Sequence, residues 1–234
     1  MGKKGFIFDL DGVIVDTAKY HFLAWKALAN SIGIDFSHQQ NEQLKGVSRE
    51  QSLIKILAWG NKKLSQDEFL SLMAKKNEAY LEYISNMDDS EILPAVNETL
   101  KYLANQRQPI ALGSASKNSK QILKKVNLLE KFDAIVDGNN VTKAKPDPEV
   151  FLKAAQAINV LPEDCVVFED SVAGIQAANT AHMISIGIGE ASVLNEADFI
   201  FKDFTYMPPG FLYKLTTLKK DAINKDDRSN QHSS

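Results

Sequence analysis

The stretch FIFDLDGVIVDTAKYHFLAWKAL, residues 6–28, joins a short apolar run to two aspartates and then to an amphipathic helical pattern. The apolar run is typical of a strand buried on both faces, and Asp9 and Asp11 follow it directly. Ligands of open parallel sheets bind at the carboxyl ends of the strands, so two acids at this position indicate a candidate binding site. Taken alone, D-x-D-G is also compatible with a turn or a helix cap. The interpretation therefore depends on the residues that follow the other strands.

Similar apolar runs recur along the chain, with helical patterns between most of them. This alternation is typical of a parallel sheet that is covered by helices on both faces. The sequence therefore predicts an α/β fold, a doubly wound parallel sheet. The expected strands are residues 5–8, 110–113, 134–136, 165–168, 184–188 and a weaker run near 201, and the expected helices are residues 96–105, 118–126, 148–158 and 172–180.

One interval interrupts the alternation. Residues 18–83 contain no strand pattern, only apolar residues at helical spacing. Helices inserted between the first two strands indicate an all-α cap, reached through residues 15–17 and left through the polar, turn-rich residues 85–94, and two adjacent linkers can form a hinge. We therefore expect a discontinuous core of residues 1–16 and 89–218, a helical cap domain of residues 17–88, and a disordered tail of residues 219–234.

Composition narrows the class of protein. The 234 residues include 44% hydrophobic and 24% charged residues and have a formal net charge of −3, which are ordinary values for a globular protein. This charge favours neither a nucleic-acid nor a membrane partner, and no apolar run has the length of a membrane span. The single cysteine, Cys165, excludes an internal disulfide and fits a reducing compartment. We expect a cytoplasmic monomer that acts on small molecules.

Four carboxylates follow two of the predicted strands. Asp9 and Asp11 come after the first strand, and Glu169 and Asp170 come after the strand at residues 165–168. Carboxylates that share one edge repel one another, which raises their pKa values unless a cation lies between them. Mg²⁺ commonly takes two or three carboxylates together with water and a phosphate oxygen. The sequence therefore predicts a magnesium site at this edge.

Phosphate-binding groups belong to the same edge. Ser114 and Ser116 follow the strand at residues 110–113, and Lys143 and Lys145 precede the helix at residues 148–158. Hydroxyl and ammonium groups can hold the oxygens of a phosphate. A carboxylate can attack phosphorus without a base, and a second acid nearby can move the proton of the leaving or entering oxygen. Together these residues indicate phosphoryl transfer.

The motifs DLDGVIVDT, SAS, KPDP and EDS, in this order and spaced by strands, resemble those of the haloacid dehalogenase superfamily of phosphotransferases. The resemblance implies a Rossmann-like core in which Asp9 is the nucleophile that becomes an aspartyl phosphate and Asp11 is the general acid and base. It also implies that Ser114 and Lys145 orient the phosphate, Lys145 fitting the K-P spacing better than Lys143. One Mg²⁺ would be held by Asp9, by the backbone carbonyl of Asp11, and by Glu169 and Asp170.

The cap and its surroundings carry a more specific resemblance. The stretches YHFLAWKALA, NEQLKGVSREQSL, KKN and SASKN resemble the sugar-phosphate mutases of this superfamily, although Gly113 stands where alanine is expected. The resemblance implies an isomerase of carbohydrate metabolism that interconverts β-D-glucose 1-phosphate and D-glucose 6-phosphate through β-glucose 1,6-bisphosphate. It places Thr17 and His21 among the catalytic residues. The implied substrate-binding residues are Trp25, Gly46, Val47, Ser48, Arg49, Lys76, Ala115, Ser116, Lys117 and Asn118.

Several of the residues that the resemblance assigns to the site also have simpler structural interpretations. Without the resemblance, Trp25 is expected in the core of the cap, Arg49 and Lys76 are expected to be solvated helix charges, and Thr17 is expected to cap a helix. Three other functions use similar groups: a sugar-phosphate phosphatase, a phosphonate hydrolase with Lys76 as a Schiff-base lysine, and a phospho-accepting receiver-like module. The insert of about 65 residues, far longer than an ordinary connection, argues against the receiver-like module.

Overall fold

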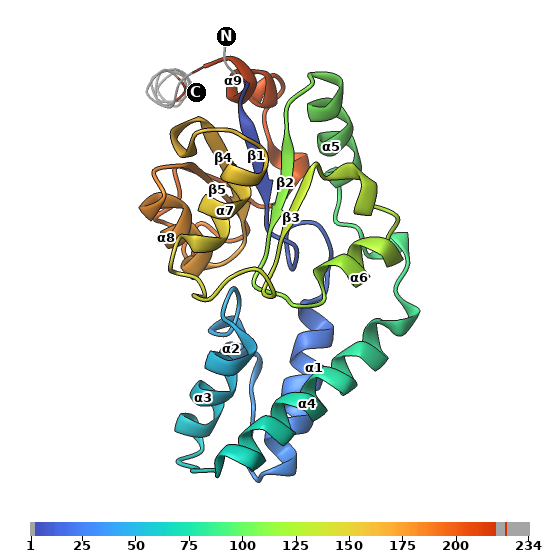
Figure 1. Ribbon diagram of the computed structural model, residues 1–234, viewed down its shortest axis with the longest axis vertical. Coiled ribbons are helices and arrows are strands. Elements are labelled where there is room, and N and C mark those ends of the chain that lie inside the picture. The colour runs from blue at the N-terminus through green and yellow to red at the C-terminus, as the bar shows by residue number, and fades with distance from the viewer. Residues whose placement is uncertain (1–2, 219–222, 224–234) are drawn as a thin grey trace.

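A six-stranded sheet, all of whose neighbouring strands are parallel, lies at the centre of the computed structural model, which describes residues 3–218 and residue 223 (Figure 1). The strand order is β3-β2-β1-β4-β5-β6, so the chain reverses its direction of winding at β1, as expected for a doubly wound sheet. The predicted α/β fold is confirmed. The strands are β1 (Gly5–Phe8), β2 (Ile110–Gly113), β3 (Ala134–Val136), β4 (Cys165–Glu169), β5 (Ile184–Ile188) and β6 (Phe199–Phe201).

Helices cover both faces of the sheet, and every residue of β1 is therefore buried. Phe6 and Phe8 point to one face and Ile7 to the other, since successive side chains of a strand alternate. The Phe6 face packs against α5 (Val96–Asn105), α6 (Ser119–Lys125) and α9 (Phe211–Thr217), whereas the Ile7 face packs against α7 (Glu149–Ala157) and α8 (Val172–Thr180). The short helix α9 was not predicted, although its residues Phe211 and Leu215 are buried.

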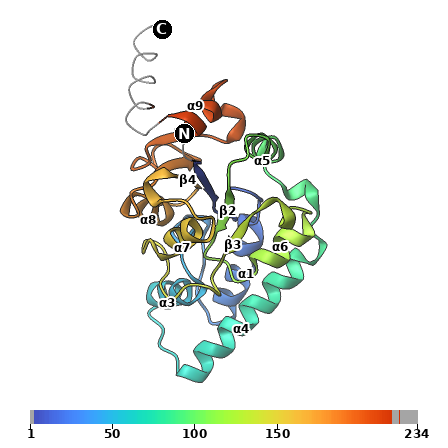
Figure 2. The same cartoon turned by 45° about the horizontal axis from the view of Figure 1, so that its top comes forward.

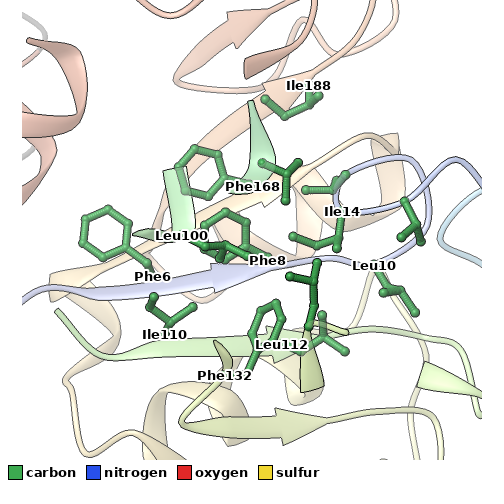
Figure 3. Close-up of a cluster of buried hydrophobic side chains, with 14 of the residues drawn as sticks. Phe6, Phe8, Leu10, Ile14, Leu100, Ile110, Leu112, Phe132, Phe168 and Ile188 are labelled. Atoms are coloured by element: carbon green, nitrogen blue, oxygen red, sulfur yellow. The ribbon is translucent and has the colours of Figure 1, made fainter. Parts of the chain in front are cut away.

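Aromatic side chains pack among leucine and isoleucine side chains on the Phe6 face of the sheet (Figure 3). Phe8 and Phe168, which lie side by side on β1 and β4, stack with ring centroids 4.6 Å apart. Phe132 meets the Phe8 ring edge-on at 6.4 Å. This packing fixes the ends of β1 and β4 next to each other, and therefore fixes the acidic residues that follow both strands.

A group of helices, here called the cap, lies beyond the carboxyl ends of the strands (Figures 1 and 2). It has its own apolar cluster, which includes Phe22, Trp25, Phe36 and Ile56 and is separate from the clusters on the two faces of the sheet. Among the described helices, none is both long enough and apolar enough to cross a membrane. The cap helices are α1 (Ala18–Ser31), α2 (His38–Glu42), α3 (Arg49–Trp59) and α4 (Gln66–Tyr83).

Two segments that run side by side connect the cap to the sheet. The amide of Asp16 donates to the carbonyl of Glu91 at 2.9 Å, and the amide of Leu93 donates to the carbonyl of Ile14 at 3.0 Å. The two linkers are thus tied to each other before the chain enters the cap and after it leaves. The predicted disordered tail, residues 219–234, lies outside the described residues except for residue 223.

Replacing Phe168 by alanine tests the role of the aromatic packing. Phe168 is fully buried, so the change should lower the free energy of unfolding by about 3–5 kcal/mol through lost contacts and a cavity. Urea denaturation measures the difference. Leu161→Ala is the control, because Leu161 is 62% exposed and its loss should change stability by less than about 0.5 kcal/mol. Equal stability losses in the two variants would contradict this role of Phe168.

Candidate active site

A buried ion cluster lies where β1 and β4 end. The Lys145 ammonium contacts Asp9 Oδ1 at 2.5 Å and Glu169 Oε1 at 3.4 Å, and the Lys145 and Glu169 side chains are fully buried. The Asp9 amide donates to the carbonyl of Phe168 at 3.0 Å, which holds the aspartate against β4. Burial and the nearby Asp11 charge raise the pKa of Asp9 above its ordinary value, while Lys145 opposes the rise. Lys143, in contrast, lies on the surface and pairs with Asp147 at 3.4 Å.

Asp9, Glu169 and Asp170 form a set of oxygen ligands. One carboxylate oxygen of each lies within 4.8 Å of those of the other two. Burial, reinforced by the neighbouring carboxylates and opposed by Lys145, raises the pKa of Glu169 to about 8. Burial also raises the pKa of Asp170 to about 7, with Lys45 opposing the rise and the Asp9 charge adding to it. Three clustered carboxylates without sulfur or imidazole ligands fit a hard divalent cation such as Mg²⁺.

Two glycines leave space for this cluster. A Cβ atom on Gly12 would lie 2.2 Å from Asp170 Oδ2, and one on Gly174 would lie 1.7 Å from Glu169 Oε1. Gly12 also has a φ of 81°, a conformation that glycine adopts without strain. Any larger residue at these positions would displace a carboxylate.

The Asp11 carboxylate contacts residues at the start of the cap. Its Oδ1 accepts a hydrogen bond from the hydroxyl of Thr17 and lies 3.5 Å from Nε2 of His21. Although burial raises the pKa of Asp11, the contacts with His21 and Thr17 outweigh it and lower the pKa overall. The carboxylate ligand set is therefore Asp9, Glu169 and Asp170, and the expected binding of the metal by the backbone carbonyl of Asp11 stays a prediction. Thr17 occupies the N-cap position of α1, as the simpler interpretation predicted, but its hydroxyl makes no cap hydrogen bond and donates to Asp11 instead.

Two cap residues in contact with each other, Lys76 and His21, connect the cap to Asp11. Lys76 Nζ lies 3.0 Å from Nδ1 of His21. Because a lysine ammonium can only donate, this contact makes Nδ1 the acceptor and leaves the proton of a neutral imidazole on Nε2, towards Asp11. Lys76 is 3% exposed, so the expectation of a solvated charge is wrong. Burial, together with the charge of Arg49, lowers the pKa of Lys76 to about 7.

Aromatic rings surround the Lys76 ammonium. The ammonium lies 4.6 Å from the centroid of Trp25 and 4.7 Å from that of Tyr80. Trp25 is 3% exposed and belongs to the apolar cluster of the cap, as the simpler interpretation predicted. A contact of Trp25 with a substrate stays a prediction.

The loop after β2 is held by its own hydroxyl groups. The Ser114 hydroxyl accepts from the amide of Ser116 at 3.1 Å, and the Ser116 hydroxyl accepts from the amide of Asn118 at 3.2 Å. Ser114 is buried, whereas Ala115 and Ser116 are half-buried and Lys117 is exposed. Because Ser114 directly follows β2 and Asp9 directly follows β1, Ser114 and the Lys145–Asp9 pair lie at the same carboxyl edge of the sheet.

The cap approaches this edge through the loop before α3. Gly46 lies so close to the core that a Cβ atom on it would be 2.3 Å from Ser171 Oγ. Val47 follows in the turn, its amide donating to the carbonyl of Leu44 at 3.2 Å. The Ser48 hydroxyl accepts from the amide of Gln51 at 3.3 Å and caps α3. These residues place the half-buried Arg49 on the first turn of the helix.

Two residues of the site, Lys45 and Asn77, were not singled out by the sequence analysis, and Ser171, which follows Asp170, also contacts the acidic cluster. Lys45 Nζ lies 3.4 Å from Asp170 Oδ2 and thus forms an ion pair between the cap and the sheet edge. Asn77 accepts hydrogen bonds from Arg49 and Asn118. The Ser171 hydroxyl donates to Glu169 and accepts from the amide of Gly174. Lys45 directly precedes the predicted Gly46, and Asn77 directly follows the predicted Lys76. Their position next to predicted site residues could have identified both.

Comparisons with known proteins identify the family to which the chain belongs. A family model described as haloacid dehalogenase-like hydrolase matches residues 3–182, and the chain belongs to this family. It is 43% identical over 201 residues to the β-phosphoglucomutase of Bacillus subtilis (strain 168), a match that covers 85% of this chain and 89% of that protein. It is also 31% identical over 180 residues to a phosphorylated carbohydrates phosphatase of Thermotoga maritima, which covers 75% of this chain and 80% of the phosphatase.

A solved structure is similar along nearly the whole chain. The crystal structure of a β-phosphoglucomutase from Clostridium difficile matches with a TM-score of 0.88 and 39% sequence identity, and the match covers 92% of this chain and 97% of that one. The sheet and the helical cap therefore both correspond to a known arrangement of this family.

Replacing Lys145 by methionine tests the ion cluster in metal-free buffer. The variant leaves buried carboxylates without their cation, which should lower the free energy of unfolding by about 3–5 kcal/mol at pH 8. The pKa of Glu169 is already raised from 4.5 to about 8, and it should rise further in the variant. A raised pKa favours the folded state at low pH, and that benefit disappears as the pH increases. The drop in the free energy of unfolding that Lys145→Met causes should therefore be smaller at pH 5 than at pH 8.

Urea denaturation of both proteins at the two pH values measures this effect. Lys143→Met is the matched control, because that side chain is 70% exposed and should contribute less than about 0.5 kcal/mol. A stability loss that does not change with pH would contradict the proposed charge balance.

Proposed function

We propose that the chain is a magnesium-dependent β-phosphoglucomutase, which interconverts β-D-glucose 1-phosphate and D-glucose 6-phosphate through β-glucose 1,6-bisphosphate. The observation that carries the proposal is the buried Asp9 carboxylate, bonded to Lys145 at 2.5 Å beneath a cap that contacts the same edge. Similarity along nearly the whole chain to two β-phosphoglucomutases supports the choice of substrate.

Asp9 is the nucleophile in this proposal. Its contact with Lys145 fixes the carboxylate and offsets part of its repulsion from an incoming phosphate. Ser114 and Lys145 orient the phosphate that is transferred. Asp9, Glu169, Asp170 and the backbone carbonyl of Asp11 would hold one Mg²⁺ per chain. Bound there, the ion would neutralise charge on the phosphate oxygens.

Asp11 moves the proton. Its two donors, Thr17 and His21, stabilise the charged carboxylate, which is the basic form. Starting from phosphorylated Asp9, Asp11 takes the proton of a sugar hydroxyl as that oxygen bonds to phosphorus and the bond to Asp9 breaks. In the second half-reaction Asp9 attacks the other phosphate of the bisphosphate, and Asp11 returns the proton to the leaving sugar oxygen. Phosphorylated Asp9 is restored at the end of the cycle.

The cap and the core grip the rest of the substrate in this proposal. Arg49 suits the second phosphate, because a guanidinium can bind two oxygens at once. Closure by the Lys45–Asp170 pair would keep water from the phosphorylated aspartate until a sugar arrives. The proposed contacts are Trp25, Gly46, Val47, Ser48, Arg49 and Lys76 from the cap, and Ala115, Ser116, Lys117 and Asn118 from the core.

Three further features complete the proposal. The core domain comprises residues 1–16 and 89–218 and the cap domain residues 17–88, a division that the separate apolar cluster of the cap supports. The protein acts as a monomer on sugar phosphates. It works in the cytoplasm, where its single cysteine, buried at Cys165, stays reduced.

A sugar-phosphate phosphatase is the second candidate, favoured by the 31% identity to a phosphatase of the same family. The two functions differ in whether a sugar hydroxyl or water receives the phosphate from Asp9. The structural feature that separates them is the degree to which the closed cap excludes water.

One assay with two readouts tests both functions. β-Glucose 1-phosphate is supplied with Mg²⁺ and a trace of glucose 1,6-bisphosphate, and glucose 6-phosphate and inorganic phosphate are followed together. We expect glucose 6-phosphate to accumulate with little free phosphate, because the closed cap shields Asp9. Excess EDTA should stop the reaction, since clustered carboxylates would then repel the substrate. Phosphate as the main product would establish the phosphatase, and the absence of both products would exclude glucose phosphates as substrates.

A further inference from the structure

One side chain connects the proposed phosphate-binding groups of the cap and the core. Asn77, half-buried on α4, accepts a hydrogen bond from Nη2 of Arg49 at 2.7 Å and another from Nδ2 of Asn118 at 3.0 Å, both on its Oδ1 atom. Arg49 begins the cap helix α3, whereas Asn118 immediately precedes the core helix α6. A single oxygen therefore joins two cap helices to the core.

Chemistry fixes the orientation of the Asn77 amide. A guanidinium has no acceptor, so the Asn77 atom that faces Arg49 must be the oxygen. Asn118 then has to present its NH₂ group to the same oxygen. Each of the two donors keeps further N–H groups, since a guanidinium has five and a carboxamide has two. Those that remain are available to a ligand between the cap and the core.

The basic side chains near Asn77 can bind an anion between the cap and the core. Among the described residues, neither Arg49 nor the adjacent Lys76 has a carboxylate within ion-pair distance. Arg49 bonds to the neutral Asn77, and Lys76 bonds to the imidazole of His21. A neutral partner orients the Arg49 guanidinium without cancelling its charge, whereas a carboxylate would compete with a phosphate for it.

We propose that Asn77 is a positioning residue that aims Arg49 and Asn118 at the second phosphate of the substrate, the one that is not being transferred. This inference rests on the proposed function, because a mutase binds a sugar carrying two phosphates. Asn77 touches neither phosphate. Its neutral oxygen sets the directions of the donors and links their orientation to closure of the cap.

The decisive variant is Asn77→Asp, which keeps the shape and the acceptor oxygen but adds a negative charge. If Asn77 served only to hold α4 against α3 and α6, aspartate would serve equally well, since it accepts the same hydrogen bonds. If Asn77 positions donors for a phosphate, the carboxylate neutralises Arg49 and repels the anion. We expect KM for β-glucose 1-phosphate to rise at least about tenfold, with kcat changed less.

Asn77→Ala removes the acceptor without adding charge. We expect a rise in KM of about fivefold, since Arg49 and Asn118 lose their common partner. Glu78→Ala is the matched control, because Glu78 is the next residue on α4 and is exposed. Its KM should equal that of the unmodified protein, and the melting temperatures of all variants establish that each is folded.

A substrate without a second phosphate separates positioning from general damage. Acetyl phosphate can phosphorylate Asp9 but has nothing for Arg49 and Asn118 to bind. Its rate of reaction should stay within about twofold of the unmodified protein in Asn77→Asp, because charges on this side of the site act on the other phosphate. Equal losses with both substrates, or an unchanged KM for the sugar phosphate in Asn77→Asp, would overturn the inference.

The products formed by the unmodified protein show whether the inference about Asn77 has failed or the proposed mutase function has failed. If it releases only inorganic phosphate from sugar phosphates, it is not a mutase. The ratio of KM values between Asn77→Asp and the unmodified protein is then measured on glucose 1,6-bisphosphate hydrolysis. A ratio of at least about tenfold would retain Asn77 as the positioning residue, and a ratio near one would reject it.

Discussion

The contact between Lys145 and Asp9 is the interaction on which the rest of the site depends. It holds a carboxylate at the end of β1 inside the protein, next to Glu169 at the end of β4. Burial and mutual repulsion raise the pKa values of the three clustered carboxylates, although Lys145 and Lys45 oppose the rise, and the site therefore favours a further cation. The aromatic packing of Phe8 on Phe168 fixes the two strand ends, and the glycines at positions 12 and 174 leave space for the acids.

The cap adds a second set of contacts to this charged edge. Lys45 reaches Asp170 from the cap, Gly46 lies against Ser171, and Asn77 meets Asn118. The cap also places His21 beside Asp11, so in the proposed mechanism the proton-transfer group and the exclusion of water depend on the same cap. The family includes a phosphatase and mutases with similar sequences, and a fold alone does not decide between such activities. The contacts between cap and core are therefore the features to test for specificity towards a sugar acceptor.

The sequence predicts the sheet well, because strands buried on both faces are continuous apolar runs. The strand Ile184–Ile188 was predicted with its observed bounds, whereas the short helices α2 and α9 lack a pattern long enough to recognise. The contacts of the Asp11 side chain with Thr17 and His21 were not predicted, because the sequence fixes the separation of Asp11 from Asp9 along the chain but not the direction of its side chain. The burial of Lys76 and the bridge from Asn77 to Asn118 depend on residues far apart in the chain, which no local pattern contains.

The central claim is that the Asp9 carboxylate carries the phosphoryl group. Protein quenched during turnover can be treated with borohydride, which reduces an aspartyl phosphate to homoserine, and then digested for mass spectrometry. The account predicts homoserine at position 9 and at no other aspartate, and none in Asp9→Asn, because the Lys145-bound carboxylate is the only one of the cluster fixed at the end of β1. Continued turnover with position 9 unmodified, or homoserine at position 170, would contradict it.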